Sequence, residues 1–418
     1  MQDDQAGGNP ARWHADSTAL ARYVADLVAA EMTRQRPGGS GLPPQPWSDD
    51  LTIAEGGLGL DSLERLTVAS VVSEALHLHE SGIGDVLLAR PRFGDWLKIA
   101  ETGLARYDAR LTFRTSGSTG SPKSCTHSRA DLEQEAAYLA SVLIGCRRVI
   151  SAVPAHHIYG FLFTVMLPPQ LRCHSVLDVR QLTPQAVRQL LRGGDLIVSH
   201  PAHWALLARH GVEFPDDVTG VSSTAPCSDE LARSLHERGL MRLMQIYGSS
   251  ETGGIGWRDA TGAPYRLMPF WTRDAADDTR LVRHALDGSQ HRLDAGDHLA
   301  WHGDACFSVG ERRDEAVQVA GTNVYPQHVG RVLRAHPQVA GASVRLMAPH
   351  EGQRLKAYIV PVAGADAEAL RVALTQWVNT RLTPAERPKA FTMGASLPRN
   401  EAGKLADWMV CGEVTQCG

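Results

Sequence analysis

TSGSTGSPKS, residues 115–124, is the stretch on which the interpretation of the whole chain depends. Gly117 and Gly120 alternate with hydroxyl residues there, and a proline precedes Lys123. Backbone N–H groups, hydroxyl donors and a cation within a few residues are what the phosphates of ATP require. The stretch is not the helix-opening phosphate loop G-x-x-x-x-G-K-[ST], because no glycine directly precedes the lysine. A flexible surface turn is the alternative interpretation.

The residues before this stretch support a ligand site. Residues 111–114 (LTFR) predict a short strand. The glycine-rich loop therefore leaves a strand end, which is a common position for a bound ligand.

Composition narrows the class of protein. A chain of 418 residues suggests two or three domains, and its hydrophobic content of 43% is typical of globular proteins. The net charge of -4 offers no bulk attraction to nucleic acid or anionic membranes, so we expect neither as a partner. No apolar run approaches the roughly 20 residues of a membrane span, and the polar start is not a signal peptide.

Cysteine and lysine usage add two further indications. The seven cysteines are scattered without a CxxC pair, which argues against zinc and fits reduced thiols in a cytoplasmic protein. Only five of the 42 basic residues are lysines. In a chain with arginine as its usual cation, a lysine inside a motif is expected to be there for its compact charge.

The first hundred residues predict helices. Residues 1–16 read as a disordered lead, and an amphipathic helix follows from Ser17. In GLGLDSLERLTV, residues 57–68, Asp61 is a good N-cap and Ser62 begins a helix. The helical segment 17–106 resembles an acyl-carrier domain. That resemblance implies that Ser62 carries 4'-phosphopantetheine, whereas the alternative is that Asp61 and Ser62 only cap the helix.

From Leu111 onward, short apolar strands alternate with helical patterns, which predicts an α/β core. The predicted strands include 148–153, 195–199 and 243–246, and the predicted helices include 129–143 and 183–191. After Gly310 the pattern changes to α+β, with strands at 316–319, 342–346 and 355–360 and helices at 327–335 and 366–381.

Further motifs follow residues 115–124 in order: PAHHIYGF (154–161), SSTAPCS (222–228), YGSSETGGIGWR (247–258) and LPRNEAGKL (397–405). Together they resemble the acyl-adenylating, AMP-binding superfamily of acyl-CoA synthetases, adenylation domains and luciferases. The resemblance covers roughly 107–418. It implies an α/β adenylate-forming core at 107–313 and a small, mobile α+β lid domain at 314–418, preceded by the helical segment.

The resemblance assigns a nucleotide site. It implies that the glycine-rich loop holds the phosphates through Thr115, Ser116, Gly117, Ser118, Thr119, Gly120 and Lys123. Adenine lies against Ser223, Thr224, Ala225, Tyr247 and Gly248. Ser250 meets the α-phosphate and Glu251 holds Mg²⁺, whose preference for oxygen ligands agrees. Asp297 and Arg312 reach the ribose; Asp304 competes with Asp297 but lies only eight residues before the arginine.

The resemblance also assigns the acid and thiol sites. His157, Gly253 and Gly254 line the carboxylic acid pocket, and Lys404 bridges the acid and the α-phosphate. Asp314 is the hinge between the domains, and Gly321 passes the pantetheine arm of the thiol. Departures from the superfamily are Gln318, in place of a lysine, and His328 and Gly330, in place of glutamates.

We therefore expect an ATP-dependent acid:thiol ligase that uses Mg²⁺. PAHHIYGF and GGIGWR are more similar to ligases for aromatic acids than to fatty acid enzymes. The thiol is coenzyme A, the chain's own Ser62 arm or a separate carrier protein. The alternative is a catalytically degenerate ligase–carrier fusion that acts as a scaffold, but the retention of Lys123, Glu251 and Lys404 speaks against it.

One architectural departure stands out. The superfamily carries well over a hundred residues of additional α/β structure before its phosphate loop, whereas this chain has mainly helices there. Either the helical segment or a partner in a homodimer supplies the missing wall, or the activity is weak or lost.

Overall fold

The computed structural model describes residues 13–36, 39, 41–115, 123–173, 175–259, 262–277, 279–312, 316–348, 351–398 and 405–410. The side chains of Glu311 and Arg312 lie outside the description. The prediction of a disordered lead over 1–16 is wrong for its last residues. Trp13–Ala15 form a short helix, η1, because the indole of Trp13 packs against the ring of Phe161 at 5.1 Å.

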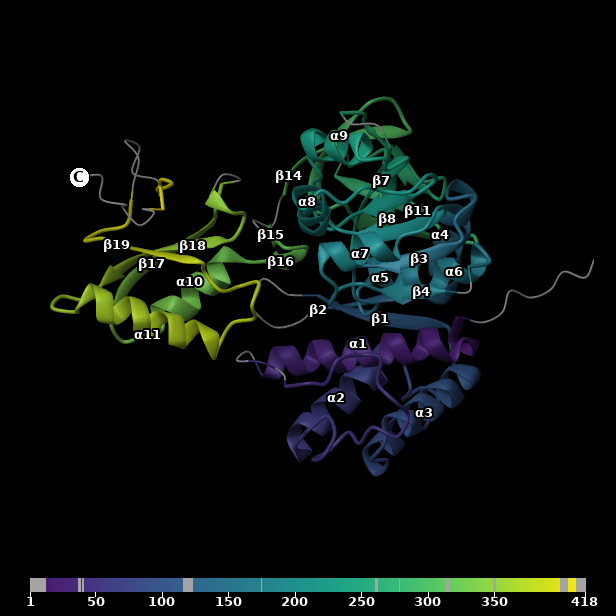
Figure 1. The fold of residues 1–418 in the computed structure, drawn as a ribbon, viewed down its shortest axis with the longest axis horizontal. Coiled ribbons are helices and arrows are strands. Elements are labelled where there is room, and N and C mark those ends of the chain that lie inside the picture. Colours follow the sequence, from purple (N-terminus) through teal and green to yellow (C-terminus); the bar gives the residue numbers. More distant parts are fainter. Residues whose placement is uncertain are drawn as a thin grey trace, which may run out of the picture.

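Among its described residues, the N-terminal segment has four further helices: α1 (Ser17–Gln35), α2 (Ser62–Ala75), η2 (Gly84–Ala89) and α3 (Phe93–Arg106). Asp16 caps α1 by accepting from the N–H groups of Thr18 and Ala19. At α2, Asp61 and Glu64 form a capping box, which satisfies backbone donors at both positions. Figure 1 shows α1 lying between the hairpin β1–β2 and the pair α2 and α3.

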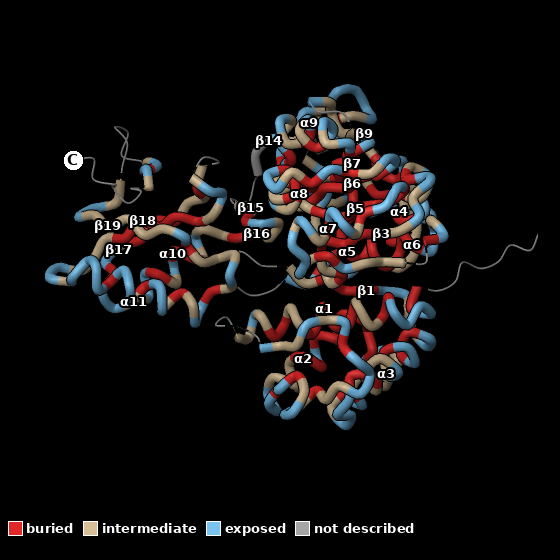
Figure 2. The backbone as a smooth tube through the Cα atoms, in the orientation of Figure 1, coloured by how far each residue is buried: buried red, intermediate tan, exposed pale blue. Residues whose placement is uncertain are grey.

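The helical segment shares its hydrophobic core with the rest of the large domain. Tyr23 of α1 is fully buried, and its ring lies 4.9 Å from Phe161 and 6.5 Å from Phe113. One buried cluster runs from Trp13 through α1, α2 and α3 to Phe307. Figure 2 shows buried segments in red both in these helices and in the strands of the large sheet. The described part of the segment therefore shares one core with the sheet domain, and its helical content agrees with the sequence.

The large domain is built on a nine-stranded sheet with the order β13-β14-β9-β8-β7-β6-β5-β3-β4. Its strands are β3 (Arg148–Ser151), β4 (Val176–Asp178), β5 (Asp195–Ser199), β6 (Thr219–Ser222), β7 (Arg242–Ser249), β8 (Gly253–Arg258), β9 (Tyr265–Leu267), β13 (Asp297–Trp301) and β14 (Cys306–Arg312). Strands β3 to β7 are parallel, and pairing from β7 through β8, β9 and β14 to β13 is antiparallel.

Helices cover both faces of the parallel half of this sheet. In β5, Leu196 and Val198 join one core while Ile197 joins the other, as expected when both faces are buried. The first face is covered by α1, α4 (Arg129–Val142), α5 (Ile158–Phe161), the π-helical η3 (Leu162–Met166) and α6 (Leu167–Gln170). The second is covered by α7 (Pro184–Leu190), α8 (Pro201–Arg209) and α9 (Asp229–Glu237).

Two smaller antiparallel elements complete the large domain. The hairpin of β1 (Arg110–Thr115) and β2 (Lys123–Ser128) pairs Thr115 with Lys123 at the glycine-rich loop. A second sheet contains β10 (Trp271–Arg273), β11 (Arg280–His284) and β12 (Gln290–Asp294). Among the helices of the described residues, none is at once long enough and apolar enough for a membrane span.

The C-terminal domain has a core of its own, centred on Val329, Leu333 and Leu374. It begins with the hairpin β15 (Val317–Val319) and β16 (Thr322–Val324). A three-stranded sheet of β17 (Val339–Leu346), β18 (Leu355–Pro361) and β19 (Ala390–Met393) packs against α10 (Pro326–Arg334) and α11 (Ala367–Asn379). Figure 1 shows this domain beside the large one, joined to it after β14. The predicted α+β pattern is confirmed.

Candidate active site

Lys123 and Glu251 come from distant parts of the chain and form an ion pair, with 2.8 Å between Nζ and Oε1. Lys123 begins β2, and Glu251 lies in the turn between β7 and β8. The hydrogen bond to Glu251 raises the pKa of Lys123. Burial opposes ionisation of Glu251, but the hydrogen bond and charge of Lys123, together with hydrogen bonds from the backbone and from Ser249, outweigh burial and leave the pKa of Glu251 below its ordinary value. The expected phosphate-binding cation and metal-binding carboxylate therefore share one site.

A second contact joins the same two elements. The ring Nε2–H of His127 on β2 donates to the carbonyl oxygen of Ser250, at 2.7 Å. Burial lowers the pKa of His127, so the ring is neutral at pH 7. The hydroxyl of Ser249 accepts from the N–H of Glu251 at 3.2 Å. These contacts hold Ser250 and Glu251 at the end of the β1–β2 hairpin.

Tyr247 and Asp297 form the next part of the site. The phenol of Tyr247 donates to Oδ2 of Asp297 at 2.8 Å and to the carbonyl of Ala295 at 3.2 Å. Asp297 is buried and is paired across β13 and β14 with the backbone of Arg312. Asp304, by contrast, is exposed in the turn between these strands. The geometry thus favours Asp297 over Asp304 as the expected ribose ligand.

The small-residue loop after β6 contacts the C-terminal domain. The hydroxyl of Ser223 donates to the carbonyl of Ile246, and Thr224 has a φ of 75°, an uncommon conformation for a β-branched residue. A Cβ on Gly321, whose φ is 84°, would lie 2.9 Å from Oγ1 of Thr224 and 3.5 Å from Cγ of His200. The hairpin β15–β16 therefore lies directly against the loop expected to hold adenine.

His157 is the N-cap residue of α5. Its side chain is exposed to solvent, yet the surrounding protein and Arg180 lower its pKa to about 4. The ring lies 4.1 Å from that of His156, whose pKa burial also lowers. Both imidazoles are therefore neutral at pH 7.

An ion pair from α1 supports the His157 loop. Asp26 is almost completely buried and accepts from the N–H of Ala155 at 2.6 Å. Its other oxygen accepts from Nη2 of Arg180 at 2.7 Å, and Arg180 also contacts Asp178 at the end of β4. Asp26 was not predicted as a functional residue. A carboxylate next to the apolar stripe of the first helix could have indicated a buried, functionally placed acid.

The glycines after Glu251 leave room for a buried carboxyl group. A Cβ on Gly254 would lie 2.4 Å from Oε1 of Glu135, and the N–H of Gly254 donates to that oxygen at 2.9 Å. A Cβ on Gly248 would lie 2.1 Å from the carbonyl oxygen of Gly253, so only glycine fits there. Glu135 was also missed, although it interrupts the apolar stripe of the predicted helix 129–143.

Several predicted site residues are not brought together here. Ser116, Gly117, Ser118, Thr119, Gly120, Asp314 and Lys404 lie outside the described residues, as does the side chain of Arg312. Ser62 is described, but it is exposed at the start of α2 within the helical segment. There the carboxylate of Asp61 accepts from the N–H groups of Leu63 and Glu64, both at 2.8 Å. This geometry agrees with the helix-cap interpretation of Asp61 and Ser62.

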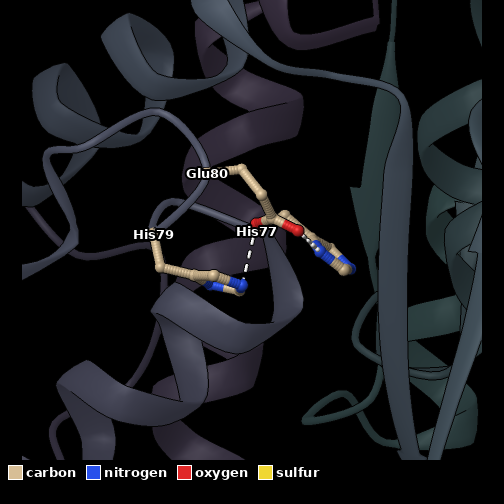
Figure 3. A group of neighbouring side chains, drawn as sticks. All are labelled: His77, His79 and Glu80. Carbon is tan, nitrogen blue, oxygen red and sulfur yellow. Dashed lines mark hydrogen bonds and ion pairs between the residues drawn. The ribbon is translucent and has the colours of Figure 1, made fainter.

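The donor set at Glu251 fits Mg²⁺. It offers one carboxylate, whose side chain is 41% exposed. The remaining coordination positions of the ion would be taken by phosphate oxygens and water. The cluster of metal-binding side chains found among the described residues lies elsewhere. It consists of His77, His79 and Glu80 (Figure 3). Oε1 of Glu80 lies 2.9 Å from Nδ1 of His77, and Oε2 of Glu80 lies 2.9 Å from Nε2 of His79. Such a nitrogen-rich set is unsuited to Mg²⁺.

Comparison with known proteins identifies the family. Residues 98–276 match the model described as AMP-binding enzyme, and residues 329–404 match AMP-binding enzyme C-terminal domain. A 4-coumarate–CoA ligase of Cereibacter sphaeroides is 38% identical over 410 residues, covering 94% of this chain and 97% of that protein. This chain belongs to the AMP-binding enzyme family. The resemblance inferred from the motifs is confirmed.

Other AMP-binding enzymes agree in length and fold. A 4-coumarate–CoA ligase of Halorhodospira halophila is 38% identical over 389 residues, covering 92% of this chain and 98% of that protein. The short region before the phosphate loop is thus shared by these relatives. The solved o-succinylbenzoate CoA synthetase of Bacillus subtilis has a TM-score of 0.61 at 18% identity, covering 94% of this chain and 92% of that one. Its similarity confirms the expected fold of an adenylate-forming core with a smaller C-terminal domain.

Proposed function

We propose that this AMP-binding enzyme is an ATP-dependent ligase that adenylates a carboxylic acid and transfers the acyl group to coenzyme A. The observation that carries the proposal is the ion pair of Lys123 and Glu251 beside the Tyr247–Asp297 pair. A phosphate-binding cation, a metal-binding carboxylate and a ribose-binding carboxylate belong together only around a nucleotide. The curated relatives named 4-coumarate–CoA ligase support the same activity.

The first step brings two anions together. A carboxylate oxygen of the acid attacks the α-phosphorus of ATP, the bond to the β-phosphate bridging oxygen breaks, and pyrophosphate leaves. Lys123 offsets negative charge on the phosphates, and Ser250 lies at the α-phosphate. Lys404, in the proposed role, bridges the acid carboxylate and the α-phosphate. Such preorganised groups contribute most where charge builds up in the transition state.

Mg²⁺, when bound at Glu251, neutralises charge on the phosphates and the leaving pyrophosphate. The chain itself prepares this ligand. Ser249 and His127 fix the turn around Glu251, and Lys123 keeps its carboxylate ionised by lowering its pKa against the effect of burial. Once ATP binds, Lys123 exchanges its contact with Glu251 for phosphate oxygens.

The second step uses the C-terminal domain. The thiol sulfur of coenzyme A attacks the carbonyl carbon of the acyl-adenylate, the thiol proton is released, and the bond to the AMP oxygen breaks. We propose that the thiol reaches the adenylate past Gly321, whose lack of a side chain leaves space beside Thr224 and His200. Asp314 is the proposed hinge about which this domain moves between the two steps.

We further propose that the acid is aromatic. The relatives' names and the motif similarities support this class. The strand that begins with Gly253 and Gly254 is surrounded by aromatic side chains: Trp271 donates to the carbonyl of Gly254 at 2.8 Å, and Trp257 and Phe270 are buried nearby in the same core. The five described cysteines are free thiols, which fits the proposed cytoplasmic location.

The helical segment is proposed to replace the missing wall, because α1 supports the His157 loop through Asp26. A homodimer stays a prediction, which analytical ultracentrifugation tests.

A degenerate scaffold remains the alternative function. The paired geometry of Lys123 with Glu251 and of Tyr247 with Asp297 favours the enzyme, since a scaffold has no need of either pair.

Acid-dependent exchange between ATP and pyrophosphate tests the proposal. The panel contains benzoic, phenylpropenoic and fatty acids, with thioester formation on coenzyme A measured in parallel. We expect exchange with phenylpropenoic acids and a decrease of about 100- to 1000-fold in Glu251→Gln. Lys404→Ala is expected to abolish exchange while ATP still binds. No exchange with any acid in the wild-type chain would favour the scaffold.

A further inference from the structure

A histidine-rich turn follows α2, and the mechanism above does not use it. It consists of residues 77–80, HLHE. His77 directly follows the C-cap residue Leu76 and adopts a φ of 52°, a left-handed conformation that most often belongs to glycine at this position. The side chain of Leu78 is fully buried and anchors the turn in the core. Because the backbone alone would favour glycine at 77, we expect the imidazole to have a use of its own.

Three side chains of this turn present ligand atoms to one another. The carboxylate of Glu80 lies between the two imidazoles (Figure 3), with one oxygen 2.9 Å from Nδ1 of His77 and the other 2.9 Å from Nε2 of His79. One ligand atom from each residue lies within 4.8 Å of the other two. Around a tetrahedral Zn²⁺ the ligand atoms are about 3.3 to 3.6 Å apart. The observed separations lie on both sides of these values, so small side-chain rotations bring the three atoms onto one ion.

A chain of hydrogen bonds orients the less exposed histidine. Nε2 of His77 lies 2.9 Å from Oγ1 of Thr112 on β1, and this hydroxyl lies 2.7 Å from Oγ1 of Thr126 on β2. When the Nε2–H donates to Thr112, Nδ1 carries the free lone pair and presents it on the side of Glu80. Histidines that bind metals usually have their second nitrogen held by such a contact.

The donor set and its exposure suit a transition metal. Two imidazole nitrogens and one carboxylate oxygen are ordinary ligands of Zn²⁺, and three protein ligands leave the fourth position to water. The side chain of His77 is 11% exposed, whereas the side chains of Glu80 and His79 are 32% and 62% exposed. One ligand is therefore fixed against the protein, and an ion can enter from the solvent side.

We propose that His77, His79 and Glu80 bind one divalent transition-metal ion of the Zn²⁺ type, with water in the remaining position. The site uses none of the residues assigned to ATP, to Mg²⁺ or to the acid. It therefore does not depend on the proposed ligase activity.

The position of the turn gives the ion a structural role. The end of α2 already contacts both strands of the β1–β2 hairpin, because Glu74 accepts from Arg114 at 2.9 Å and from Ser124 at 2.6 Å. The ion adds a second attachment to the same hairpin through His77 and Thr112. Metal binding thus stabilises the packing of the helical segment on the hairpin.

Zinc titration of the full, metal-free chain by isothermal calorimetry tests the proposal. His79→Ala and Glu80→Gln should each weaken zinc binding by at least about 10-fold, because each variant loses a ligand. Thr112→Val keeps the ligands but removes the hydroxyl that orients His77, and it should weaken binding by about 10-fold. His210→Ala, which removes an exposed histidine after α8, is the matched control and should bind zinc as the wild type does. Excess Mg²⁺ should not compete.

Urea unfolding gives a second readout that needs no enzyme activity. Free Zn²⁺ at 100 times its Kd should raise the folding equilibrium constant of the wild type about 100-fold, and His79→Ala should lose most of this increase. If the wild type binds no zinc, the two histidines only donate N–H groups to Glu80, and the proposal is wrong. Equal zinc affinity in the wild type and Glu80→Gln would place the ion elsewhere on the chain and would overturn it as well. If His79→Ala does not fold, Glu80→Gln decides.

Discussion

The carboxylate of Asp26 on α1 accepts a hydrogen bond of 2.6 Å from the backbone N–H of Ala155, in the loop that carries His157. This contact places the first helix of the chain directly beneath the candidate acid site. Arg180 neutralises the buried carboxylate from the other side, at 2.7 Å. The N-terminal helices are therefore part of the ligase core.

We expect Asp26→Ala to destabilise the protein by about 3 kcal/mol, because it leaves Arg180 partly buried without its closest buried partner. Equilibrium unfolding in urea measures this. Glu213→Ala, which breaks an exposed ion pair with Arg188, is the control and should change stability by less than about 1 kcal/mol. Equal effects of the two substitutions would show that the Asp26 contact contributes little.

Asp297→Asn should weaken ATP binding, whereas Asp304→Asn should not. Asp297 is buried beside Tyr247, but Asp304 is exposed in a turn. Losing a charged acceptor for the ribose hydroxyls is expected to raise the KM for ATP by about 10- to 100-fold. Steady-state kinetics with saturating acid measures the change. A larger effect in Asp304→Asn would reverse the assignment.

Gly321→Ala should impair thioester formation more than adenylation. The new Cβ would lie 2.9 Å from Oγ1 of Thr224 and would adopt a φ of 84°, which is unfavourable for alanine. We expect at least a roughly 10-fold slower transfer to coenzyme A, because even a small displacement of a reacting group is costly. Trapping the adenylate with hydroxylamine reports the first step, which should stay within about threefold of the wild type. Equal losses in both steps would contradict the role of Gly321 in the thiol path.

Glu135 should make stability depend on pH. Its pKa is raised from 4.5 in the unfolded chain to about 7 in the native state by burial, with Asp131 raising it further and Arg283 opposing. Between these values the native state keeps a proton that the unfolded chain has released, so stability falls as pH rises, by at most about 1.4 kcal/mol per pH unit. The Glu135→Gln variant cannot release this proton and should not lose stability in this way as pH rises. In urea unfolding at several pH values, the stability of the variant relative to the wild type should increase from pH 4.5 to 7 and stay level above pH 7. A stability difference that does not change with pH would contradict the raised pKa of Glu135.

Ser62→Ala should leave thioester formation on coenzyme A unchanged. The helix cap is provided by Asp61, and the helices around Ser62 share the core of the large domain. A mobile carrier arm therefore has no separate domain to move with. Intact mass after incubation with a broad phosphopantetheinyl transferase and coenzyme A should also stay unchanged. A mass increase that Ser62→Ala abolishes would establish the carrier role.

Local patterns predicted much of the fold. Strand 195–199 and helix 129–143 were expected and are found as β5 and α4, because their apolar spacing and length reflect burial directly. The antiparallel strands from β8 to β14 were not predicted. Their sequences are rich in glycine and charge, and they pair only because neighbouring strands of the sheet are already in place.

The order and chemistry of the motifs determined the family. They also predicted a nucleotide site and Asp297 as a candidate within it, since each depends on residues close together in sequence. Tertiary structure alone decided that Lys123 meets Glu251, that α1 supports the His157 loop and that Glu135 faces Gly253. These contacts join residues more than a hundred positions apart. Their geometry follows from how the helices pack on the sheet, which local spacing does not encode.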